Sequence, residues 1–584
     1  MQLFRHSIVQ GVLWPRLNAM HQPASSPRAS IYYDYQVFAP WLPSAHEPQP
    51  PQQVVIAGSG PAGMVTALEL ARHGVRSVVL ESEQQVSAGS RAIVFTRRSM
   101  EILQQVGVAD RMQQAGLPWQ FGNSYYRGQR VFRMEAPHDE DDRFGPMLNI
   151  QQQYMEQYLH EACAASPLID FRWGNKLVRV EQNEQFATLE IDTPEGPYQL
   201  RTQWLVAADG GRSGIRQSMG LKMEGSSYEG LFVIADIRVD LPLPTERLAF
   251  FDPEWNRGNT ILMHREPHGI WRLDYQLPAG ETPEQALSPE SLKTRIDAQL
   301  AMIGYPGIAW ELDWSSVYSA RTLTLPHYIY GRTLFTGDAA HLLPIFGVRG
   351  ANTAFQDAQS LGWHLALVAQ GKAQPTLLHN YSRERVAAAR EIIDEAGKST
   401  RFMTPPTLGF RLLRDAVLSL SLTQPFVRPL FHWRTSRPHA YSDSRLNSPC
   451  DDNALFTQGL GHGAPPQNVR LGPAQFLLDH LGGAFELLYF TDQTALPAAL
   501  QACIAAIRSQ GLPLRVTAIT GQGSASVEGA DQTLLDPMGQ VQQRYGVQQA
   551  GSAYLLRPDQ HVCARWLQLD AQRLQATFDH IQQC

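Results

Sequence analysis

The chain has 584 residues, of which 43% are hydrophobic and 18% charged, an ordinary globular composition that excludes wholesale disorder. Its length corresponds to about three to five domains. The 49 Lys and Arg against 55 Asp and Glu give a net charge of −6 without a basic tract, so no nucleic-acid partner is predicted. The five cysteines are far apart and form no CxxC, so no metal site is predicted and a reducing cytoplasm is favoured.

Residues 1–51 are predicted to be an N-terminal extension that ends in a proline-rich, extended linker. The apolar stretch at its start is short and interrupted by polar residues, so it lacks the pattern of a secretory signal. No run of 18 or more apolar residues occurs in the chain, and neither a membrane span nor a membrane partner is predicted.

A β-turn-α-β pattern follows the linker and carries the motif G-x-G-x-x-G at its first turn. Gly58 would allow the tight turn, Gly60 would let the backbone approach a pyrophosphate, and Gly63 would let the helix pack closely on the strand. The pyrophosphate would then lie at a helix N-terminus, where free N–H groups favour an anion. Glu81 ends the second strand and is placed to bind a ribose. The residues predicted to bind a dinucleotide in this unit are Gly58, Gly60, Ala62, Gly63 and Glu81.

Two later strands also end in polar turns. An apolar strand over 204–208 runs into Asp209 and Gly210, and another runs into Gly337 and Asp338, followed by His341, Pro344 and a glycine-rich turn. A long helix is predicted over 351–371, and its N-terminus at Gly350, Ala351 and Asn352 would offer free N–H donors. Taken alone, the pattern at Asp209 and Gly210 also fits a solvated polar turn with no binding role. The pattern at Gly337 and Asp338 also fits a capped helix beside a buried His341.

Together, in this order and spacing, the three motifs resemble the class A, single-component FAD-dependent aromatic monooxygenases related to phenol hydroxylase and 3-(3-hydroxyphenyl)propionate hydroxylase. The resemblance covers about residues 52–440 and implies FAD as the bound cofactor. Residues 89–110 and 149–159 are similar to two further flavin-contacting segments of this family. They add Arg91 and Gln152 to the expected contacts, alongside Asp209, Gly210, Gly337, Asp338 and the helix start at Gly350, Ala351 and Asn352.

The resemblance implies an α/β fold in which a Rossmann-type FAD-binding domain is interleaved with a β-sheet substrate domain, as in p-hydroxybenzoate hydroxylase. A C-terminal thioredoxin-like α/β domain would follow. Its first strand leads into TDQTALP where a redox thioredoxin carries CxxC, so packing or dimerisation is expected of it rather than thiol chemistry. The expected boundaries are 52–225 and 329–445 for the FAD-binding domain, 226–328 for the substrate domain, 446–472 for a linker and 473–584 for the thioredoxin-like domain.

The family reaction implies that NAD(P)H reduces FAD, and that dioxygen then forms a flavin C4a-hydroperoxide which hydroxylates a phenolic ring. Apolar and polar residues alternate along the strand predicted over 269–277, which places Arg272 and Asp274 on one face. Arg272 matches the family's phenol-placing arginine, whereas Asp274 stands where the phenol hydroxylase branch has tyrosine. Pro344 matches a position near the oxygen-reaction face. Arg272, Asp274 and Pro344 are therefore the expected catalytic residues, with a non-catalytic ion pair between Arg272 and Asp274 as the alternative.

The predicted function is hydroxylation of a small aromatic compound with NAD(P)H and dioxygen, in aromatic catabolism, by a cytoplasmic enzyme. Epoxidation or another oxidative tailoring reaction on the same fold is one alternative, and a non-catalytic flavin-binding module is another. A halogenase is disfavoured because no WxWxIP segment occurs. The substrate, the choice between NADH and NADPH, and a homodimer all remain open at this point.

Overall fold

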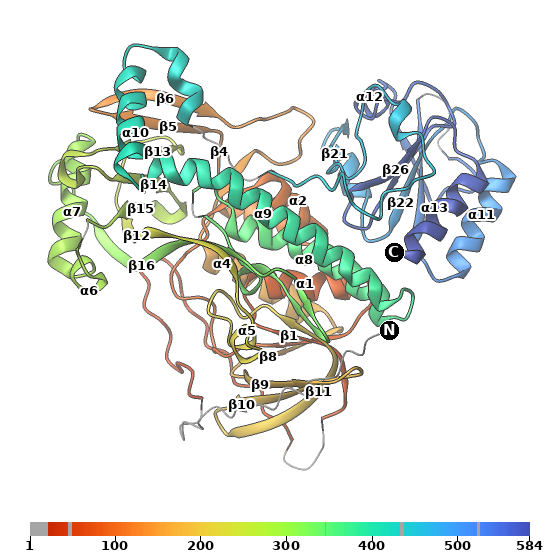
Figure 1. The fold of residues 1–584 in the computed structure, drawn as a ribbon, viewed down its shortest axis with the longest axis horizontal. Coiled ribbons are helices and arrows are strands. Elements are labelled where there is room, and N and C mark those ends of the chain that lie inside the picture. The colour runs from red at the N-terminus through yellow and green to blue at the C-terminus, as the bar shows by residue number, and fades with distance from the viewer. Residues whose placement is uncertain (1–20, 45–48, 279, 345, 432–436, 522–525) are drawn as a thin grey trace, which may run out of the picture.

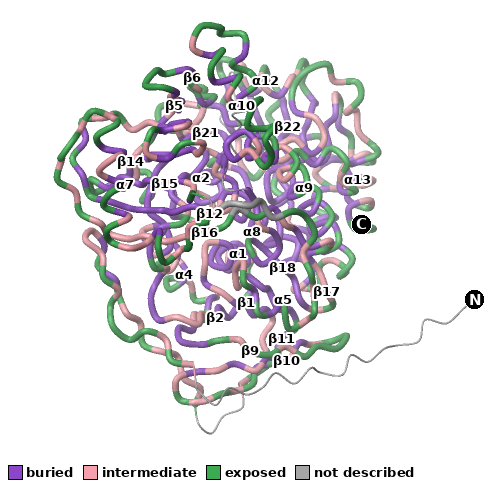
Figure 2. The backbone as a smooth tube through the Cα atoms, turned by 60° about the vertical axis from the view of Figure 1, so that its left-hand side comes forward, coloured by how far each residue is buried: buried purple, intermediate pink, exposed green. Residues whose placement is uncertain are grey.

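Two eight-stranded sheets and a separate five-stranded sheet organise the chain, as the computed structural model shows for residues 21–44, 49–278, 280–344, 346–431, 437–521 and 526–584 (Figure 1). The side chains of residues 227–230 and 320 are not described either. Buried backbone concentrates where the first two sheets meet, around α1, α8 and β12 (Figure 2). Within the described ranges, no helix combines the length and the apolar character that crossing a membrane requires.

The first sheet forms the predicted cofactor domain, low in Figure 1. Strands β1, β2, β8, β11 and β18 are parallel, and β2 is buried at all four positions, as parallel strands covered on both faces are. Helix α1 packs on α8 and α4. The strands are β1 (Gln52–Ala57), β2 (Ser77–Leu80), β8 (Ile169–Arg172), β9 (Lys176–Gln182), β10 (Ala187–Thr193), β11 (Gly196–Ala207), β17 (Ile329–Tyr330) and β18 (Thr333–Phe335). The helices are α1 (Pro61–Arg72), α4 (Gln152–Ala165), α5 (Gly214–Ser218) and α8 (Gly350–Ala369).

The second sheet is almost wholly antiparallel and runs in the order β19-β16-β12-β15-β14-β13-β5-β6. Trp271, Leu273 and Tyr275 of β15 pack toward α7 on one face, as the alternation predicts. The sheet takes in β5 and β6, which lie outside the expected 226–328 segment. Its strands are β5 (Phe121–Tyr126), β6 (Gln129–Glu135), β12 (Glu224–Arg238), β13 (Arg247–Phe251), β14 (Thr260–Arg265), β15 (Ile270–Gln276), β16 (Glu311–Thr324) and β19 (His341–Leu342). Its helices are α6 (Pro283–Ala286) and α7 (Pro289–Met302).

A small three-stranded sheet and a helical region join these two layers. The small sheet has the order β3-β7-β4, and the long helix α9 packs against α8 and β16. The elements are β3 (Val94–Thr96), α2 (Arg97–Gln105), α3 (Ala109–Ala115), β4 (Leu117–Trp119), β7 (Met147–Asn149), α9 (Leu378–Met403) and α10 (Leu408–Ser421).

The C-terminal domain has the sheet order β24-β23-β22-β25-β26, with β22 central, β23 parallel to it and β25 antiparallel. This arrangement, with helices α11 and α13, is thioredoxin-like, and β22 is the predicted first strand that leads into TDQTALP. Cys563 is buried, and no cysteine follows β22 where a redox thioredoxin has CxxC. The elements are β20 (Arg470–Gly472), β21 (Gln475–Phe476), β22 (Phe485–Phe490), α11 (Ala498–Ser509), β23 (Leu514–Thr520), β24 (Gln532–Leu535), α12 (Gln540–Arg544), β25 (Ala553–Leu556), β26 (Val562–Trp566) and α13 (Ala571–Gln583).

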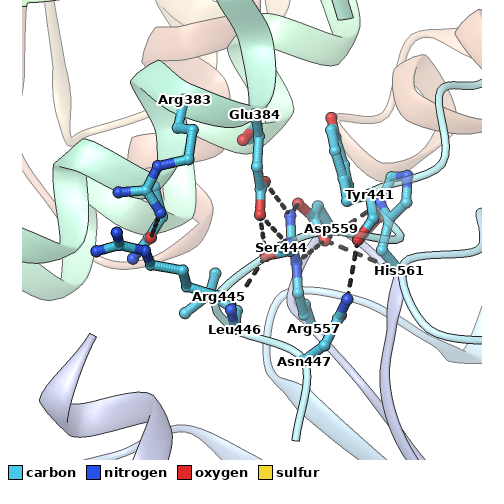
Figure 3. Close-up of polar contacts among 12 residues, drawn as sticks. Arg383, Glu384, Tyr441, Ser444, Arg445, Leu446, Asn447, Arg557, Asp559 and His561 are labelled. Atoms are coloured by element: carbon cyan, nitrogen blue, oxygen red, sulfur yellow. Dashed lines mark hydrogen bonds and ion pairs between the residues drawn. The ribbon is translucent and has the colours of Figure 1, made fainter. Parts of the chain in front are cut away.

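A buried ion cluster fastens this domain to the rest of the chain (Figure 3). Arg557, in the turn between β25 and β26, donates to both carboxylate oxygens of Glu384 on α9, at 2.7 and 3.0 Å. It also donates to Asp559, which accepts a hydrogen bond from the indole N–H of Trp363 on α8 at 3.1 Å. Only 1% of the Arg557 side chain is exposed. The turn therefore contacts the helix whose N-terminus is predicted to face the flavin.

Arg557→Met should destabilise the fold by about 3–5 kcal/mol, because it leaves two carboxylates buried without their cation. Denaturant unfolding followed by circular dichroism measures this loss. Arg179→Met is the control, since Arg179 and Glu181 form an exposed pair on β9 whose removal should cost about 0–1 kcal/mol. Similar midpoints for the two variants would show that the cluster does not hold the C-terminal domain in place.

Candidate active site

The glycines of the first turn have three different surroundings. Gly58 has φ +104°, and a Cβ there would lie 2.4 Å from the carbonyl oxygen of Ala208. A Cβ on Gly63 would lie 1.9 Å from the carbonyl oxygen of Gly58. The fold itself requires glycine at both positions. At Gly60 a Cβ would meet nothing within 4 Å, and no side chain caps the helix that Gly60 precedes. The open space beside an uncapped helix N-terminus fits a pyrophosphate.

Glu81 braces the same turn from the end of β2. One carboxylate oxygen accepts hydrogen bonds from the backbone N–H and hydroxyl of Ser59, at 2.9 and 2.7 Å. The other accepts from the Ser82 hydroxyl at 3.1 Å and the Glu83 N–H at 2.9 Å. A carboxylate has about four acceptor sites, so these contacts occupy all of them. A ribose would bind Glu81 by replacing the two serine hydroxyls, which can rotate away.

The two aspartates at the later strand ends retain acceptor capacity. Asp209 accepts the Ile215 N–H at 3.1 Å through one oxygen, whereas its other oxygen is buried and has no hydrogen-bond partner among the described residues. Solvent reaches the side chain of Asp338, yet desolvation by the surrounding protein raises the pKa of its carboxyl. Beside Asp209, a Cβ on Gly210 would also meet nothing within 4 Å. These features fit the hydroxyl-rich chain of FAD.

Gln152 and Asn352 use their side chains to position backbone segments. The Gln152 carbonyl oxygen accepts the N–H groups of Arg91 and Ala92, at 3.2 and 3.0 Å. The Asn352 amide accepts from Thr96 and donates to the carbonyl oxygens of Val94 and Val348, which fixes the start of α8 against β3. Contact of Asn352 with a cofactor would therefore use its backbone N–H. A Cβ on Gly350, at the start of α8, would meet nothing within 4 Å, and Ala351 follows it in the first turn.

His341 braces the Gly337–Asp338 turn through a shared carboxylate. Its Nε2 lies 2.6 Å from Asp357 on α8, and the same carboxylate accepts from Arg385 at 2.6 Å and from the Gly337 N–H at 3.3 Å. All three side chains are fully buried. His341 is therefore held in place as a brace of this turn.

Arg272 forms its hydrogen bonds and ion pairs with residues other than Asp274, its partner in the alternative interpretation. Arg272 forms a bidentate ion pair with Asp236, which lies directly opposite on β12. Two guanidinium nitrogens donate to the two carboxylate oxygens, at 2.8 and 2.7 Å. Arg272 also donates to the carbonyl oxygens of Ser90 and Arg91. With only 1% of its surface exposed, Arg272 positions the predicted flavin-contacting segment. A direct contact between Arg272 and the substrate stays a prediction.

Asp274 differs from Arg272 because it is only partly buried and its carboxylate forms no hydrogen bond or ion pair with any described residue, although its backbone pairs with β12 and β14. Desolvation raises the pKa of its carboxyl to about 6, helped by Asp236 and opposed by Arg272 and Arg247. Asp274 also raises the pKa of Tyr318 on β16, although desolvation contributes most to that shift. A carboxylate that titrates near neutrality without a protein partner can exchange a proton with a ligand.

The turn after Pro344 covers this same face of the sheet. Phe346 packs edge-on against Phe232, with ring centroids 5.6 Å apart, and Phe232 neighbours Tyr318 across β12 and β16. Pro344 is buried at the start of this turn. The fold therefore brings the segment leading into α8 onto the sheet face that carries Asp274.

Sequence reasoning missed four polar residues of this face, namely Asp236, His264, Arg247 and Tyr318. One row of the sheet carries Asp236, Arg272, His264 and Arg247 side by side, and Tyr318 lies nearby. One sequence signal for this row was available. Arg247 begins the otherwise apolar strand Arg247-Leu-Ala-Phe-Phe, and a buried charge needs polar partners nearby. Within the described residues, no three His, Cys, Asp or Glu side chains are arranged to hold a metal ion.

Comparison with protein families matches residues 52–396 to the FAD binding domain family. The 3-(3-hydroxy-phenyl)propionate/3-hydroxycinnamic acid hydroxylase of Mycolicibacterium smegmatis is 29% identical over 368 residues, which are 62% of this chain and 64% of that protein. The protein of the same name from Escherichia coli (strain SMS-3-5 / SECEC) is 31% identical over 384 residues, 65% of this chain and 67% of that protein. The match thus spans about two thirds of these relatives.

Solved structures with the same fold cover nearly the whole chain. The flavin-dependent monooxygenase PieE, in complex with FAD and substrate, superposes with a TM-score of 0.76 at 22% identity, covering 92% of this chain and all of that one. Aklavinone-11 hydroxylase with FAD and aklavinone gives 0.73 at 24% identity and the same coverage. The expected interleaved fold with a C-terminal domain is confirmed, and the chain belongs to the FAD binding domain family, with FAD as its cofactor.

Proposed function

We propose that this protein is an FAD-dependent monooxygenase that hydroxylates a small phenolic compound with NAD(P)H and dioxygen. The observation that carries the proposal is the unpartnered Asp274 carboxylate, which faces the turn that leads into α8. The sequence relatives are named hydroxylases of hydroxylated phenylpropionic or cinnamic acids, and a structural relative of 24% identity is p-nitrophenol 4-monooxygenase from Pseudomonas putida. All of these names describe phenolic substrates.

Each part of the site has a separate task in this proposal. Bound FAD supplies the redox chemistry with oxygen, and Gly60, Asp209 and the first turn of α8 hold it. The positive end of α8 favours negative charge on the flavin ring. Asp274 accepts the phenolic proton at a carboxylate oxygen, because a phenolate ring is attacked faster than a phenol. Pro344 and Phe346 exclude water from the face where the ring would bind.

Arg272 acts through other groups in this proposal. Its ion pair with Asp236 fixes its guanidinium, which in turn holds the carbonyl groups of Ser90 and Arg91. Its charge also limits the rise in the pKa of Asp274. The alternative ion pair between Arg272 and Asp274 is not formed, which leaves Asp274 available to a substrate.

A panel of phenols tests the proposed function directly. Purified holoenzyme is mixed with NADH or NADPH and each phenol, and oxygen uptake, nicotinamide oxidation and ring-hydroxylated product are measured separately. At least one phenol should yield product together with oxygen uptake. Oxidation without oxygen uptake would indicate a dehydrogenase, epoxide products would indicate the tailoring alternative, and absence of any turnover would indicate a non-catalytic flavoprotein.

A cytoplasmic location and a homodimer belong to the same proposal. All five cysteines are free, as is usual in a reducing compartment.

Exposed apolar side chains gather on α10 and the turn after it, including Leu412 at 62% and Phe426 at 75% exposure, and a second copy would cover such a patch. Sedimentation velocity of the holoenzyme, with monomer mass 65.2 kDa, distinguishes monomer from dimer.

A further inference from the structure

Residues 21–44, here called the N-terminal arm, lie along residues 82–91, here called the cofactor loop. The loop connects Glu81, the predicted ribose acceptor, with Arg91, a predicted flavin contact. Every residue from Ser82 to Ser87, and also Gly89, makes a hydrogen bond with the arm. Neither segment contains a helix or a strand. Each therefore supplies the hydrogen bonds that the other lacks.

The contacts follow the loop from one end to the other. Arg28 pairs with Glu83 at 2.9 Å, and its backbone N–H donates to the Gln85 side chain at 3.0 Å. Phe38 and Gln84 exchange two hydrogen bonds of 2.8 Å each, one from the backbone N–H of Phe38 and one from the amide of Gln84. The contacts involve both backbone and side-chain groups of the loop, so they fix its path as well as its side chains.

Tyr35 closes the far end of the loop. Its hydroxyl donates to the Ser87 carbonyl oxygen at 3.1 Å and accepts the Gly89 N–H at 3.2 Å. Only 7% of Tyr35 is exposed, and its ring packs edge-on against Tyr33 at 4.8 Å. One buried hydroxyl thus bridges two backbone groups of the cofactor loop.

The arm also reaches the substrate sheet. The Ser30 hydroxyl and the Ile31 N–H both donate to Asp313 on β16, at 2.7 Å each. Arg272 of β15, in the same sheet, donates to the carbonyl oxygens of Ser90 and Arg91. The cofactor loop is therefore held by contacts with both the arm and the sheet.

We propose that the N-terminal arm is a clamp that keeps the cofactor loop in its FAD-binding shape and slows FAD release. A loop without regular structure loses conformational freedom when it binds a ligand, and contacts that order it beforehand remove that cost. Opening the loop to release FAD would break the arm contacts first. The arm precedes residue 52, where the family match begins, so the clamp is a feature of this chain outside the shared domain. The inference rests on FAD binding and is independent of the proposed hydroxylation.

Tyr35→Phe in the full-length holoenzyme tests the clamp. It removes the hydroxyl that bridges Ser87 and Gly89 and keeps the packed ring. The matched control is Tyr33→Phe, because Tyr33 is also 7% exposed but its hydroxyl donates to Gln157 on α4. Release of FAD after dilution is followed by the rise in free-flavin fluorescence. Tyr35→Phe should release FAD roughly tenfold faster than the wild type, as the loss of its two hydrogen bonds to the cofactor loop implies. The Tyr35 hydroxyl also accepts from Gln153 on α4 at 3.2 Å, and Tyr33→Phe likewise loses one hydrogen bond to α4, yet it should be near the wild type.

A second measurement needs no variant. Because linkage of equilibrium affinities is reciprocal, FAD should protect the amides of the arm from hydrogen exchange if the docked arm raises the affinity for FAD. Exchange is compared for peptides of residues 21–44 in flavin-loaded and flavin-stripped protein. Equal rates of FAD release from the Tyr35→Phe and Tyr33→Phe variants would overturn the clamp. The same holds if amide hydrogen exchange in the arm is equally fast with and without FAD. Neither readout depends on turnover, so a protein that hydroxylates no phenol would still give a clear answer.

Discussion

Gly60→Val is expected to abolish FAD retention while the chain still folds. The backbone at Gly60 has φ −64°, which any residue adopts, and a Cβ there meets no protein atom within 4 Å. A branched side chain would therefore fill space that the fold leaves open. That space lies at the N-terminus of α1, where the pyrophosphate of a dinucleotide binds. The absorbance ratio of flavin to protein in the purified variant measures the loss.

Two further variants separate ligand loss from misfolding. Gly58→Ala should reduce thermal stability as well as flavin content, because its Cβ would lie 2.4 Å from the Ala208 carbonyl oxygen at φ +104°. Asp338→Ala should weaken FAD binding less than Gly60→Val, since it removes hydrogen bonds of about 0.5–1.5 kcal/mol each without inserting bulk. Full flavin occupancy in Gly60→Val, with a normal melting temperature, would refute the assigned pyrophosphate site.

Elements with a strong local pattern could be predicted from the sequence. The turn at Gly58–Gly63 lies between β1 and α1 as expected, because short apolar strands and glycine spacing are local signals. The first strand of the C-terminal domain, predicted to lead into TDQTALP, is likewise found as β22. The alternation of β15 also gave the correct faces, since the period of a strand fixes which side chains point the same way.

Partners across strands could not be predicted, because strand register is set by the whole sheet. Arg272 binds Asp236, which lies on a strand 36 residues earlier in the chain. No local pattern links those two positions. The N-terminal arm is a similar case, since its composition predicted an extended segment but gave no indication of the loop it contacts. For the same reason Arg247 and Tyr318 were missed, although Arg247 lowers the pKa of Asp274 and Asp274 raises the pKa of Tyr318.

Asp274→Asn is expected to slow hydroxylation by roughly 10²-fold or more, the usual scale for lost acid–base help. The amide keeps the shape of the carboxyl group but cannot accept the phenolic proton. FAD content should stay normal, because the residues predicted to hold the cofactor lie in other segments. Product formed per nicotinamide oxidised should fall, and hydrogen peroxide should rise, because an unactivated ring reacts too slowly. Product and peroxide are measured in the same reaction.

The pH dependence gives an independent check. Asp274 must be ionised to accept a proton, and its pKa is raised to about 6. The rate of hydroxylation by the wild type should therefore fall as the pH decreases through about 6. The Asp274→Asn variant should lack this limb, because nothing titrates at that position. A limb of the same shape in both proteins would assign the titration to another group.

Thermal stability distinguishes a catalytic Asp274 from a structural one. The folded-state pKa of about 6 lies above the ordinary value of 3.8, so the folded protein favours the protonated carboxyl. The stability this contributes is complete below pH 3.8 and is lost as the pH rises through about 6. Above pH 6 the neutral asparagine should therefore match or exceed the melting temperature of the wild type. A structural role predicts the opposite, a lower melting temperature with unchanged coupling of product to NAD(P)H, and that result would move the substrate site away from β15.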